Sequence, residues 1–145
     1  MRVYAAGRTV TTTPGATAGP QLEGSAGHPF WVVEVGVFNT TTTAFNVGLS
    51  RFSVSGTPGA ALTEQPEDPE FTPVLTVASG VNSTAATLSG GPYTFASIGA
   101  AIGAGVIWTF GKNGLKVAGA ADGGMMLYVP NGTGQHFDFY RVWEE

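Results

Sequence analysis

Hydrophobic and polar residues alternate along much of this chain with a period of two, at which the side chains of a β-strand reach the same face of a sheet. Residues 30–39 form one of the clearest runs. One face of this run would carry Trp31, Val33, Val35 and Val37. Because the opposite face is also largely apolar, we expect a central strand that is covered on both sides.

A second alternating run follows at residues 45–53, after a threonine-rich turn at residues 40–43. Phe45, Val47 and Leu49 would share one face of this run. Two such runs with a short turn between them predict a β-hairpin over residues 30–53. In that hairpin, Glu34 would pair with Arg51 across the two strands.

The last segment of the chain reads as strand, turn and strand. An apolar run at residues 125–129 precedes an Asn131-Gly132 turn signal, and an alternating aromatic run then reaches Trp143. This pattern predicts a second hairpin. The inward face of its last strand would carry Phe137, Phe139, Arg141 and Trp143. We expect this strand to lie centrally in a sheet, since chain ends are poorly ordered unless they are tied down.

Shorter runs predict further strands at residues 2–11, 74–88, 93–98, 106–110 and 115–117, and Val3 and Ala5 of the first would point inward. Two segments lack any period and are rich in proline, glycine and threonine. They are an N-terminal arm or loop at about residues 11–29 and a Pro-rich acidic loop at about residues 54–73.

Eight to ten short strands with no amphipathic helix predict an all-β fold. An antiparallel β-sandwich of jelly-roll type fits this number and spacing, and so does a related closed barrel. The length of 145 residues suits one domain over residues 1–145.

The composition changes the picture of the surface. Charged residues make up only 11% of the chain, against roughly 25% in typical soluble domains. Such a surface favours a protein that lies against other protein surfaces, although a neutral secreted domain has a similar composition. The net charge of -4 and the lack of any basic run argue against nucleic-acid binding.

The chain has no cysteine, which excludes disulfides, thiolate metal sites and cysteine nucleophiles. Its first residues run directly into strand-like sequence, so we expect no signal peptide. Residues 95–110 are apolar, but glycines interrupt them and they are shorter than the roughly 20 residues of a membrane span. We therefore expect a loop or strand connection there, and no membrane.

Candidate chemistry is sparse. His136 and Asp138 would share a strand face as a base and its orienting carboxylate, but no nucleophile motif accompanies them. A structural or interfacial pair is the favoured interpretation, and we expect no enzyme activity. Residues 103–105 lack the full phosphate-binding fingerprint, so the sequence indicates no cofactor.

Four acidic residues gather in the Pro-rich loop. They are Glu64, Glu67, Asp68 and Glu70. Carboxylates on a loop can hold Ca²⁺, but this spacing lacks the glycine turn of a known calcium loop, so a solvated loop is favoured over a metal site.

Two other features suggest ligands or modification. Six aromatic residues on predicted strands would form a sugar-stacking face if they lay together, although tryptophans inside strands belong more often to the core. They are Trp31, Trp108, Trp143, Tyr93, Tyr128 and Tyr140. Asn39, Asn82 and Asn131 begin glycosylation triplets, which arise by chance in a chain so rich in threonine.

Several stretches resemble small all-β structural proteins of tailed bacteriophages. They are residues 34–39, 47–52 and 105–110, the Gly-Leu-Lys-Val strand after the Lys-Asn turn, Gly123-Gly124, and the terminal aromatic strand ending in Trp143-Glu144-Glu145. The likeness is one of pattern and composition over residues 30–145.

This resemblance implies a virion protein made in the host cytoplasm, most plausibly a capsid decoration (cement) protein on the capsid surface. Such a protein would bind the major capsid protein or other virion subunits as a homo-oligomer, with a trimer favoured. The irregular segments would then supply the interface, with Pro14, Pro20, Pro58, Pro66, Pro69 and Phe71. The alternative is a tail-associated β-sandwich that binds carbohydrate or a receptor.

Overall fold

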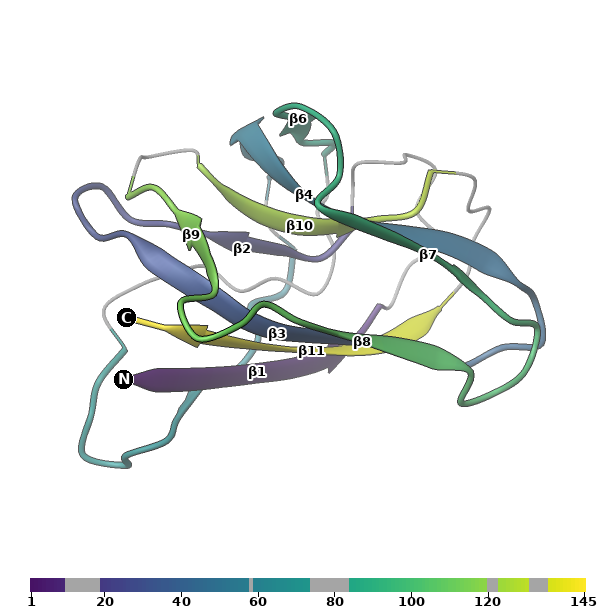
Figure 1. Ribbon diagram of the computed structural model, residues 1–145, viewed down its shortest axis with the longest axis horizontal. Coiled ribbons are helices and arrows are strands. Elements are labelled where there is room, and N and C mark those ends of the chain that lie inside the picture. Colours follow the sequence, from purple (N-terminus) through teal and green to yellow (C-terminus); the bar gives the residue numbers. More distant parts are fainter. Residues whose placement is uncertain (10–18, 58, 74–83, 120–122, 131–135) are drawn as a thin grey trace.

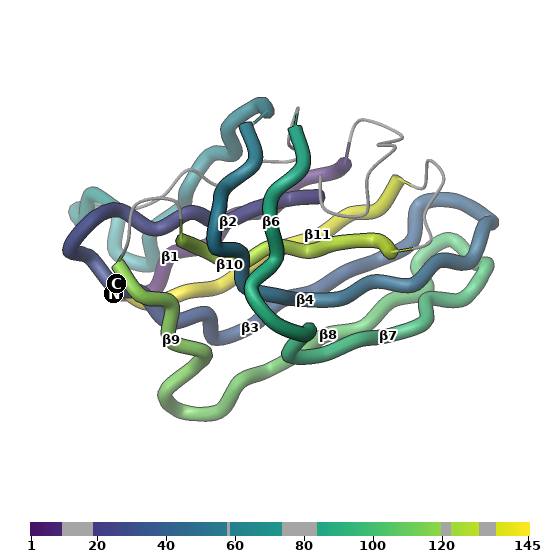
Figure 2. Tube along the Cα trace, turned by 90° about the horizontal axis from the view of Figure 1, so that it is seen from above, coloured from purple at the N-terminus to yellow at the C-terminus, as the bar shows by residue number. Residues whose placement is uncertain are grey.

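Two antiparallel sheets make up the chain in the computed structural model, which describes all residues except 10–18, 58, 74–83, 120–122 and 131–135. No helix occurs among these described residues, so none that could cross a membrane is found there. The sheets lie one above the other, as Figures 1 and 2 show from two directions. The predicted all-β class and two-sheet antiparallel architecture are therefore confirmed.

The first sheet, called sheet A, has its longest strands in the middle. Its strands run in the order β5 (Gln65–Pro66), β1 (Arg2–Arg8), β11 (Phe137–Glu144), β3 (Phe30–Asn39) and β8 (Gly105–Thr109). The short β9 (Leu115–Val117) pairs with the beginning of β3, on the same side as β8.

The second sheet, called sheet B, is centred on β10 and β4. Its order is β2 (Gln21–Glu23), β10 (Gly124–Tyr128), β4 (Phe45–Val54) and β6 (Thr87–Leu88), and β7 (Thr94–Ile98) pairs with the first half of β4. The described residues thus form eleven strands, so the expected eight to ten is not confirmed.

The position of the last strand was predicted correctly. β11 lies between β1 and β3, and Figure 1 shows both chain ends on the same side of the molecule. The Met1 ammonium group donates to the Glu145 main-chain oxygen at 2.8 Å. The predicted inward residues are buried: Phe137, Phe139, Arg141 and Trp143 of β11, and Val3 and Ala5 of β1.

Both predicted hairpins are wrong. β3 lies in sheet A and β4 in sheet B, so the turn at residues 40–43 crosses between the sheets. β10 and β11 are likewise in different sheets. Alternation shows which side chains of a strand are buried. It does not show whether the following strand pairs within the same sheet or belongs to the other sheet, because the alternation is the same in both cases.

A β-bulge changes the phase of β3. The register with β11 runs from Glu34 opposite Val142 to Val32 opposite Trp143, so Val33 has no opposite residue in β11. Val35 and Val37 are buried as predicted, but Phe30 and Val32, rather than Trp31 and Val33, are buried before the bulge. The single face predicted for the whole strand is therefore wrong in its first half.

Each of the two segments expected to be irregular contributes a short strand, one to sheet B and the other to sheet A. Within residues 11–29, Gln21 and Leu22 are fully buried in β2, which pairs with β10. Within residues 54–73, β5 pairs with β1, and Leu62 and Phe71 pack against the core. The Pro-rich loop thus closes the β1 edge of sheet A.

Candidate functional site

The outer face of sheet A carries an ordered aromatic cluster built on a glycine. Tyr140 lies opposite Gly36, and a Cβ atom at position 36 would overlap the Tyr140 ring. The ring stacks on Phe38 with 6.3 Å between centroids, and its hydroxyl donates to Glu34 Oε1 at 2.6 Å. Burial, followed by the hydrogen bond and the charge of Glu34, raises the pKa of Tyr140 to about 12.

Sheet B repeats this arrangement on its own outer face. The Tyr128 ring lies over Gly48, its cross-strand neighbour, and the Phe52 ring lies over Gly124. The aromatic rings thereby cover backbone that glycine leaves bare. On both sheets, an aromatic ring on the side away from the main core thus packs against a glycine, and in sheet B the rings of Tyr128 and Phe52 are themselves buried in a second hydrophobic cluster.

Two ion pairs flank the aromatic cluster of sheet A. Arg8 holds Asp138 with two hydrogen bonds, of 2.6 Å to Oδ1 and 2.9 Å to Oδ2, and Arg2 holds Glu144 at 3.0 Å. The hydrogen bond from Arg8 is the main cause that lowers the pKa of Asp138. Solvent reaches all four side chains and screens the charges, so neither pair adds much to stability.

The structure gives His136, Asp138 and Glu34 other partners than the sequence analysis expected. Nδ1 of His136 lies 2.7 Å from the main-chain oxygen of Thr9, while the Asp138 carboxylate binds Arg8. No hydrogen bond joins His136 to Asp138, so the structure does not assemble them as a base and its orienting group. The expected pairing of Glu34 with Arg51 is wrong, because Glu34 binds Tyr140 in one sheet and Arg51 belongs to the other.

Two arginines bridge the sheets from their inner faces. Arg141 of β11 is buried and donates to the main-chain oxygen of Gln21 at 2.5 Å. Its Nη2 has no hydrogen-bond partner, and burial lowers the pKa of Arg141 to about 9. Arg51 of β4 donates to the main-chain oxygen of Lys116 in β9 and lies 4.8 Å from the centroid of the Tyr93 ring.

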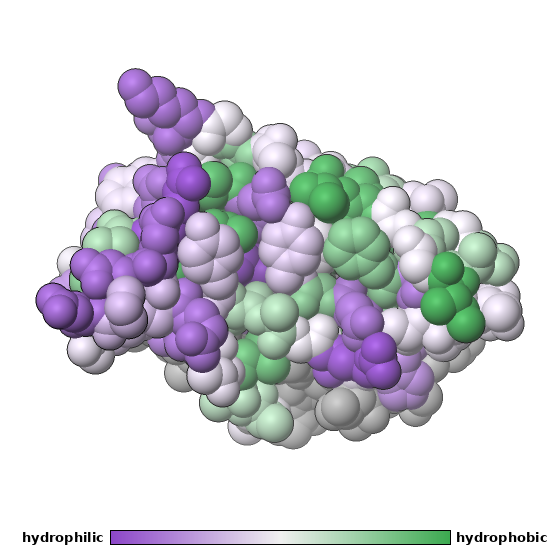
Figure 3. Space-filling view, turned by 90° about the horizontal axis from the view of Figure 1, so that it is seen from below, coloured by the Kyte–Doolittle hydropathy of each residue, from purple (hydrophilic) through white to green (hydrophobic). Residues whose placement is uncertain are grey.

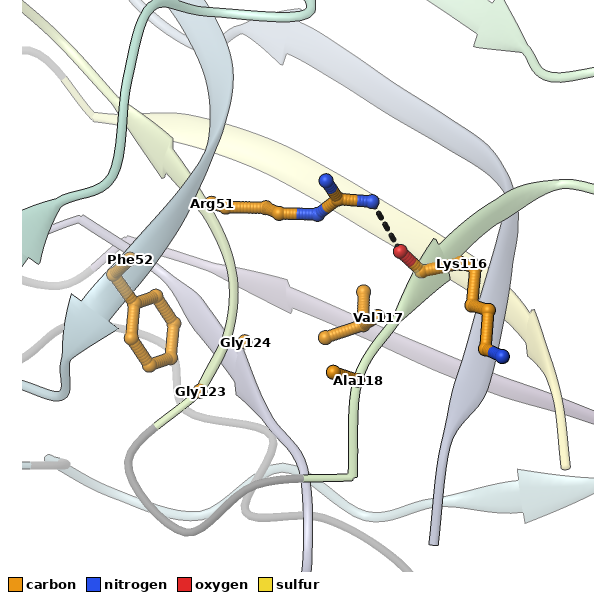
Figure 4. A pocket seen from close by; sticks show the side chains of 7 residues that line it. All are labelled: Arg51, Phe52, Lys116, Val117, Ala118, Gly123 and Gly124. Atoms are coloured by element: carbon orange, nitrogen blue, oxygen red, sulfur yellow. Dashed lines mark hydrogen bonds between the residues drawn. The ribbon is translucent and has the colours of Figure 1, made fainter.

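A pocket of about 310 Å³ opens beside Arg51. Figure 4 shows its lining: Arg51, Phe52, Lys116, Val117, Ala118, Gly123 and Gly124. The Lys116 side chain leads away from Arg51 in this view, and its ammonium lies 5.7 Å from the centroid of the Trp31 ring. Among the described residues, this lining contains no acid, histidine, serine or threonine, so none of them supplies a nucleophile or general base of these types.

The acidic loop has local roles for two of its four carboxylate residues. The Glu67 amide donates to the Arg2 carbonyl at 2.8 Å, and the Asp68 carboxylate accepts from the Glu70 amide at 2.9 Å. In the described part of the chain, no three histidine, aspartate or glutamate side chains gather as a metal site requires.

The first glycosylation triplet is structural. Asn39 is 1% exposed, and its Nδ2 donates to the carbonyls of Thr43 and Gly99 at 2.9 and 2.8 Å. Its Oδ1 accepts from both the amide and the hydroxyl of Thr41. The Asn39 amide is therefore unavailable to a glycosyl donor, and the other two asparagines lie outside the described residues.

The six candidate sugar-stacking rings do not share a face. Trp143 is completely buried in the core, and the partly buried Trp108 of β8 packs against the same core. Tyr140 lies on the outer face of sheet A, and Tyr128 lies over Gly48 on the outer face of sheet B. Alternation along a strand thus distributes these residues over different surfaces.

The predicted interface residues have differing environments. Pro20 is buried and its carbonyl accepts from the Leu127 amide at 3.0 Å, Pro66 is part of β5, and Phe71 packs against the core. Of the set, Pro69 is exposed. Pro14 and Pro58 lie outside the described residues.

Three exposed apolar side chains that the sequence analysis missed lie on β7, the following turn and β8. Phe95, Ile102 and Ile107 are 49%, 72% and 52% exposed, and we call these three residues the β7–β8 patch. Phe95 lies opposite Gly48 on the outer face of sheet B and Ile107 lies opposite Gly36 on the outer face of sheet A, so the three residues surround this side of the molecule and do not form one flat face. Figure 3 looks onto the sheet A side, where strongly apolar side chains stand at the top and at the right. The sequence feature that could have indicated this surface is a lack of charge, because residues 71–111 contain no aspartate, glutamate, lysine or arginine.

Comparisons with known proteins leave these surfaces to be interpreted from their own geometry. No protein-family model, no curated protein and no solved structure matches this chain.

Proposed function

We propose that this chain is a structural protein of a bacteriophage particle, a capsid decoration (cement) protein that binds the outside of the shell. The observation that carries this proposal is the β7–β8 patch, three large exposed apolar side chains within the uncharged segment 71–111. Burying such side chains against another protein is favourable, and no charge in this segment opposes it. The resemblance to small virion proteins gives the setting.

The strand order supports a jelly-roll form of the sandwich. The order β1-β11-β3-β8 in sheet A and β2-β10-β4-β7 in sheet B places sequence-distant strands side by side. Among these eight strands, each one lies in the other sheet from the one before it, except that β4 and β7 both lie in sheet B. A jelly roll is a two-sheet barrel of eight strands built from two Greek keys, and we propose that these eight strands form one.

Rigid packing suits a decoration role. The Tyr140 ring on Gly36 and the Tyr128 ring on Gly48 stiffen the outer faces, and the first and last residues are hydrogen bonded to each other. We propose that the sandwich serves as a preformed body and the major capsid protein as its partner. A preformed surface binds with little ordering cost.

The test is binding of the purified protein to mature, expanded phage shells, followed by sedimentation of the shells. We expect saturable binding that Ile102→Asp weakens at least tenfold, because a charge would then have to be desolvated in the contact. Ala6→Asp, at an exposed position of β1 that is separated from β8 by β11 and β3, serves as the matched control. A folded wild-type protein that never sediments with shells contradicts the proposal.

A carbohydrate- or receptor-binding module is the second candidate. Tyr4 is 39% exposed on the outer face of sheet A, where β1 neighbours β11 and its Tyr140. An exposed ring in a sheet that also carries Glu34 is the combination that stacks on and hydrogen bonds to a sugar. Glycan-array binding that Tyr4→Ala removes would support this function over shell decoration.

A further inference from the structure

Two strand edges lie side by side along one long side of the molecule. β7 is at the edge of sheet B and β8 is at the edge of sheet A, as Figures 1 and 2 show. β8 has β3 on one side, and no strand among the described residues pairs with its other side. An unpaired edge presents main-chain N–H and C=O groups to another strand.

The hydrogen bonds at the two ends of β8 show which residues present these groups. The Phe110 amide donates to the Val33 carbonyl at 2.9 Å, and the Ala104 carbonyl accepts from the Asn39 amide at 2.8 Å. Antiparallel pairs alternate between hydrogen-bonded and non-hydrogen-bonded, so Val106 and Trp108 also point their main-chain groups toward β3. Gly105, Ile107 and Thr109 therefore point theirs outward.

The usual protections of an edge strand are missing from β8. It contains no proline or charged residue, and its five-residue register with β3 shows no bulge. By contrast, the opposite edge of sheet A is closed by β5, which carries Pro66 and is followed by Glu67 and Asp68. The β5 edge of sheet A is therefore protected against pairing with another strand, whereas the β8 edge is open to it.

We propose that β8 pairs with β8 of a second copy of this chain, antiparallel and about a two-fold axis at Ile107. In this register, Ile107 lies opposite its own counterpart and Gly105 lies opposite Thr109. These positions are the outward-pointing ones, so every outward amide and carbonyl from Gly105 to Thr109 gains a partner. Sheet A then continues from one copy into the other.

Symmetry favours a second copy over a different protein, and charge does not oppose a second copy at this edge. Each chain has a net charge of -4, so two copies repel each other over most of their surfaces. The uncharged segment 71–111 is free of this repulsion. A two-fold contact also needs a self-complementary surface, and an antiparallel edge centred on one residue meets that requirement.

This contact uses Ile107 of the β7–β8 patch but is measured without shells, and it predicts a dimer where the resemblance implies a trimer. Light scattering after gel filtration should give the mass of a dimer for the wild-type chain. Ile107→Lys should give a monomer, because two ammonium groups would face each other across the axis. Since Ile107 is 52% exposed, the variant should keep the circular dichroism spectrum of the wild type.

A crosslink tests the register directly. Directly opposed residues of a hydrogen-bonded pair have Cα atoms about 5.5 Å apart, which lies within the range of a disulfide. The chain has no cysteine, so Ile107→Cys introduces a single thiol. Mild oxidation should link most Ile107→Cys chains in pairs and leave Ala6→Cys, exposed on the same sheet, unlinked.

Three results would overturn the proposal: a wild-type monomer, a wild-type trimer, or a folded Ile107→Cys chain that links no faster than Ala6→Cys. Shell sedimentation tests the proposed function in a separate experiment. Shells that bind a wild-type chain which light scattering shows to be a monomer leave decoration standing, whereas dimers that never bind shells leave the β8 contact standing.

Discussion

The guanidinium of Arg141 donates to the main-chain oxygen of Gln21 across the core, and so joins the central strand of sheet A to the edge strand of sheet B. Its Nη1 lies 2.5 Å from that oxygen. The side chain is 2% exposed and has an aromatic neighbour, with the Phe139 ring centroid 5.1 Å from its Cζ atom. A buried cation with so few partners carries a desolvation cost that its contacts offset only partly.

Replacing Arg141 should separate the effect of its charge from that of its volume. Arg141→Met keeps much of the volume and removes the buried charge, so we expect stability to be unchanged or raised by about 1–4 kcal/mol. Arg141→Ala leaves a cavity as well and should cost about 2–5 kcal/mol. Urea unfolding measures both, and an Arg141→Met variant as unstable as Arg141→Ala would show that the charge itself stabilises the fold.

Tyr140→Phe should remove the hydrogen bond to Glu34 while the ring stays on Gly36. A half-buried hydrogen bond to a carboxylate is expected to contribute about 1 kcal/mol. The pKa of Tyr140 is raised from 10.0 to about 12, so the folded protein holds this proton more tightly than the unfolded chain does. That contribution to stability is fully present below pH 10 and is lost as the pH rises toward about 12.

Unfolding free energies of the wild type and of Tyr140→Phe, measured across this alkaline range, test the assignment. The difference between the two proteins should shrink as the pH rises from 10.0 to about 12. A difference that stays constant with pH would mean that the phenol proton is not what Glu34 stabilises.

Alternation along the chain predicts the buried faces well and the strand partners poorly. Phe137, Phe139 and Trp143 are buried as their spacing indicates, because burial depends on the local period. The partners of β3 and β10 depend on whether a turn stays within a sheet or crosses to the other, and the same turn residues serve both. Glu34 shows the result, since its partner is Tyr140 and not Arg51.

Three other features could not be predicted because the local sequence does not mark them. β2 has only three residues and includes Gln21 and Glu23, so its sequence shows no hydrophobic alternation, although Leu22 is completely buried. The bulge at Val33 shifts the phase of β3 without a glycine or proline to mark it. The β7–β8 patch was read from residues 95–110 as an apolar connection, because the sequence does not show that β8 is an edge strand.

Asn39→Asp should destabilise the fold although the two side chains have the same shape. The aspartate replaces an amide that donates to the carbonyls of Thr43 and Gly99, so an oxygen would face those oxygens in a buried site. Each buried acceptor left without its donor costs about 1–3 kcal/mol. Asn46→Asp is the control, because Oδ1 of Asn46 accepts from the Ser97 hydroxyl, which an aspartate also accepts. Thermal unfolding should separate the two variants, and equal effects would refute the role of the Asn39 donors.

Gly36→Ala tests whether the Tyr140 ring needs the bare backbone beneath it. An added methyl group would overlap the ring, which must then move from Phe38 and from Glu34, so we expect a loss of about 1–3 kcal/mol. Gly91→Ala is the matched control, because a Cβ atom at that position meets nothing within 4 Å. Near-ultraviolet circular dichroism would report the displaced ring alongside urea unfolding. If Gly36→Ala is as stable as Gly91→Ala and keeps the wild-type aromatic spectrum, the ring is not held by the glycine, and the stiffness attributed to the outer face of sheet A must come from the ladder hydrogen bonds alone.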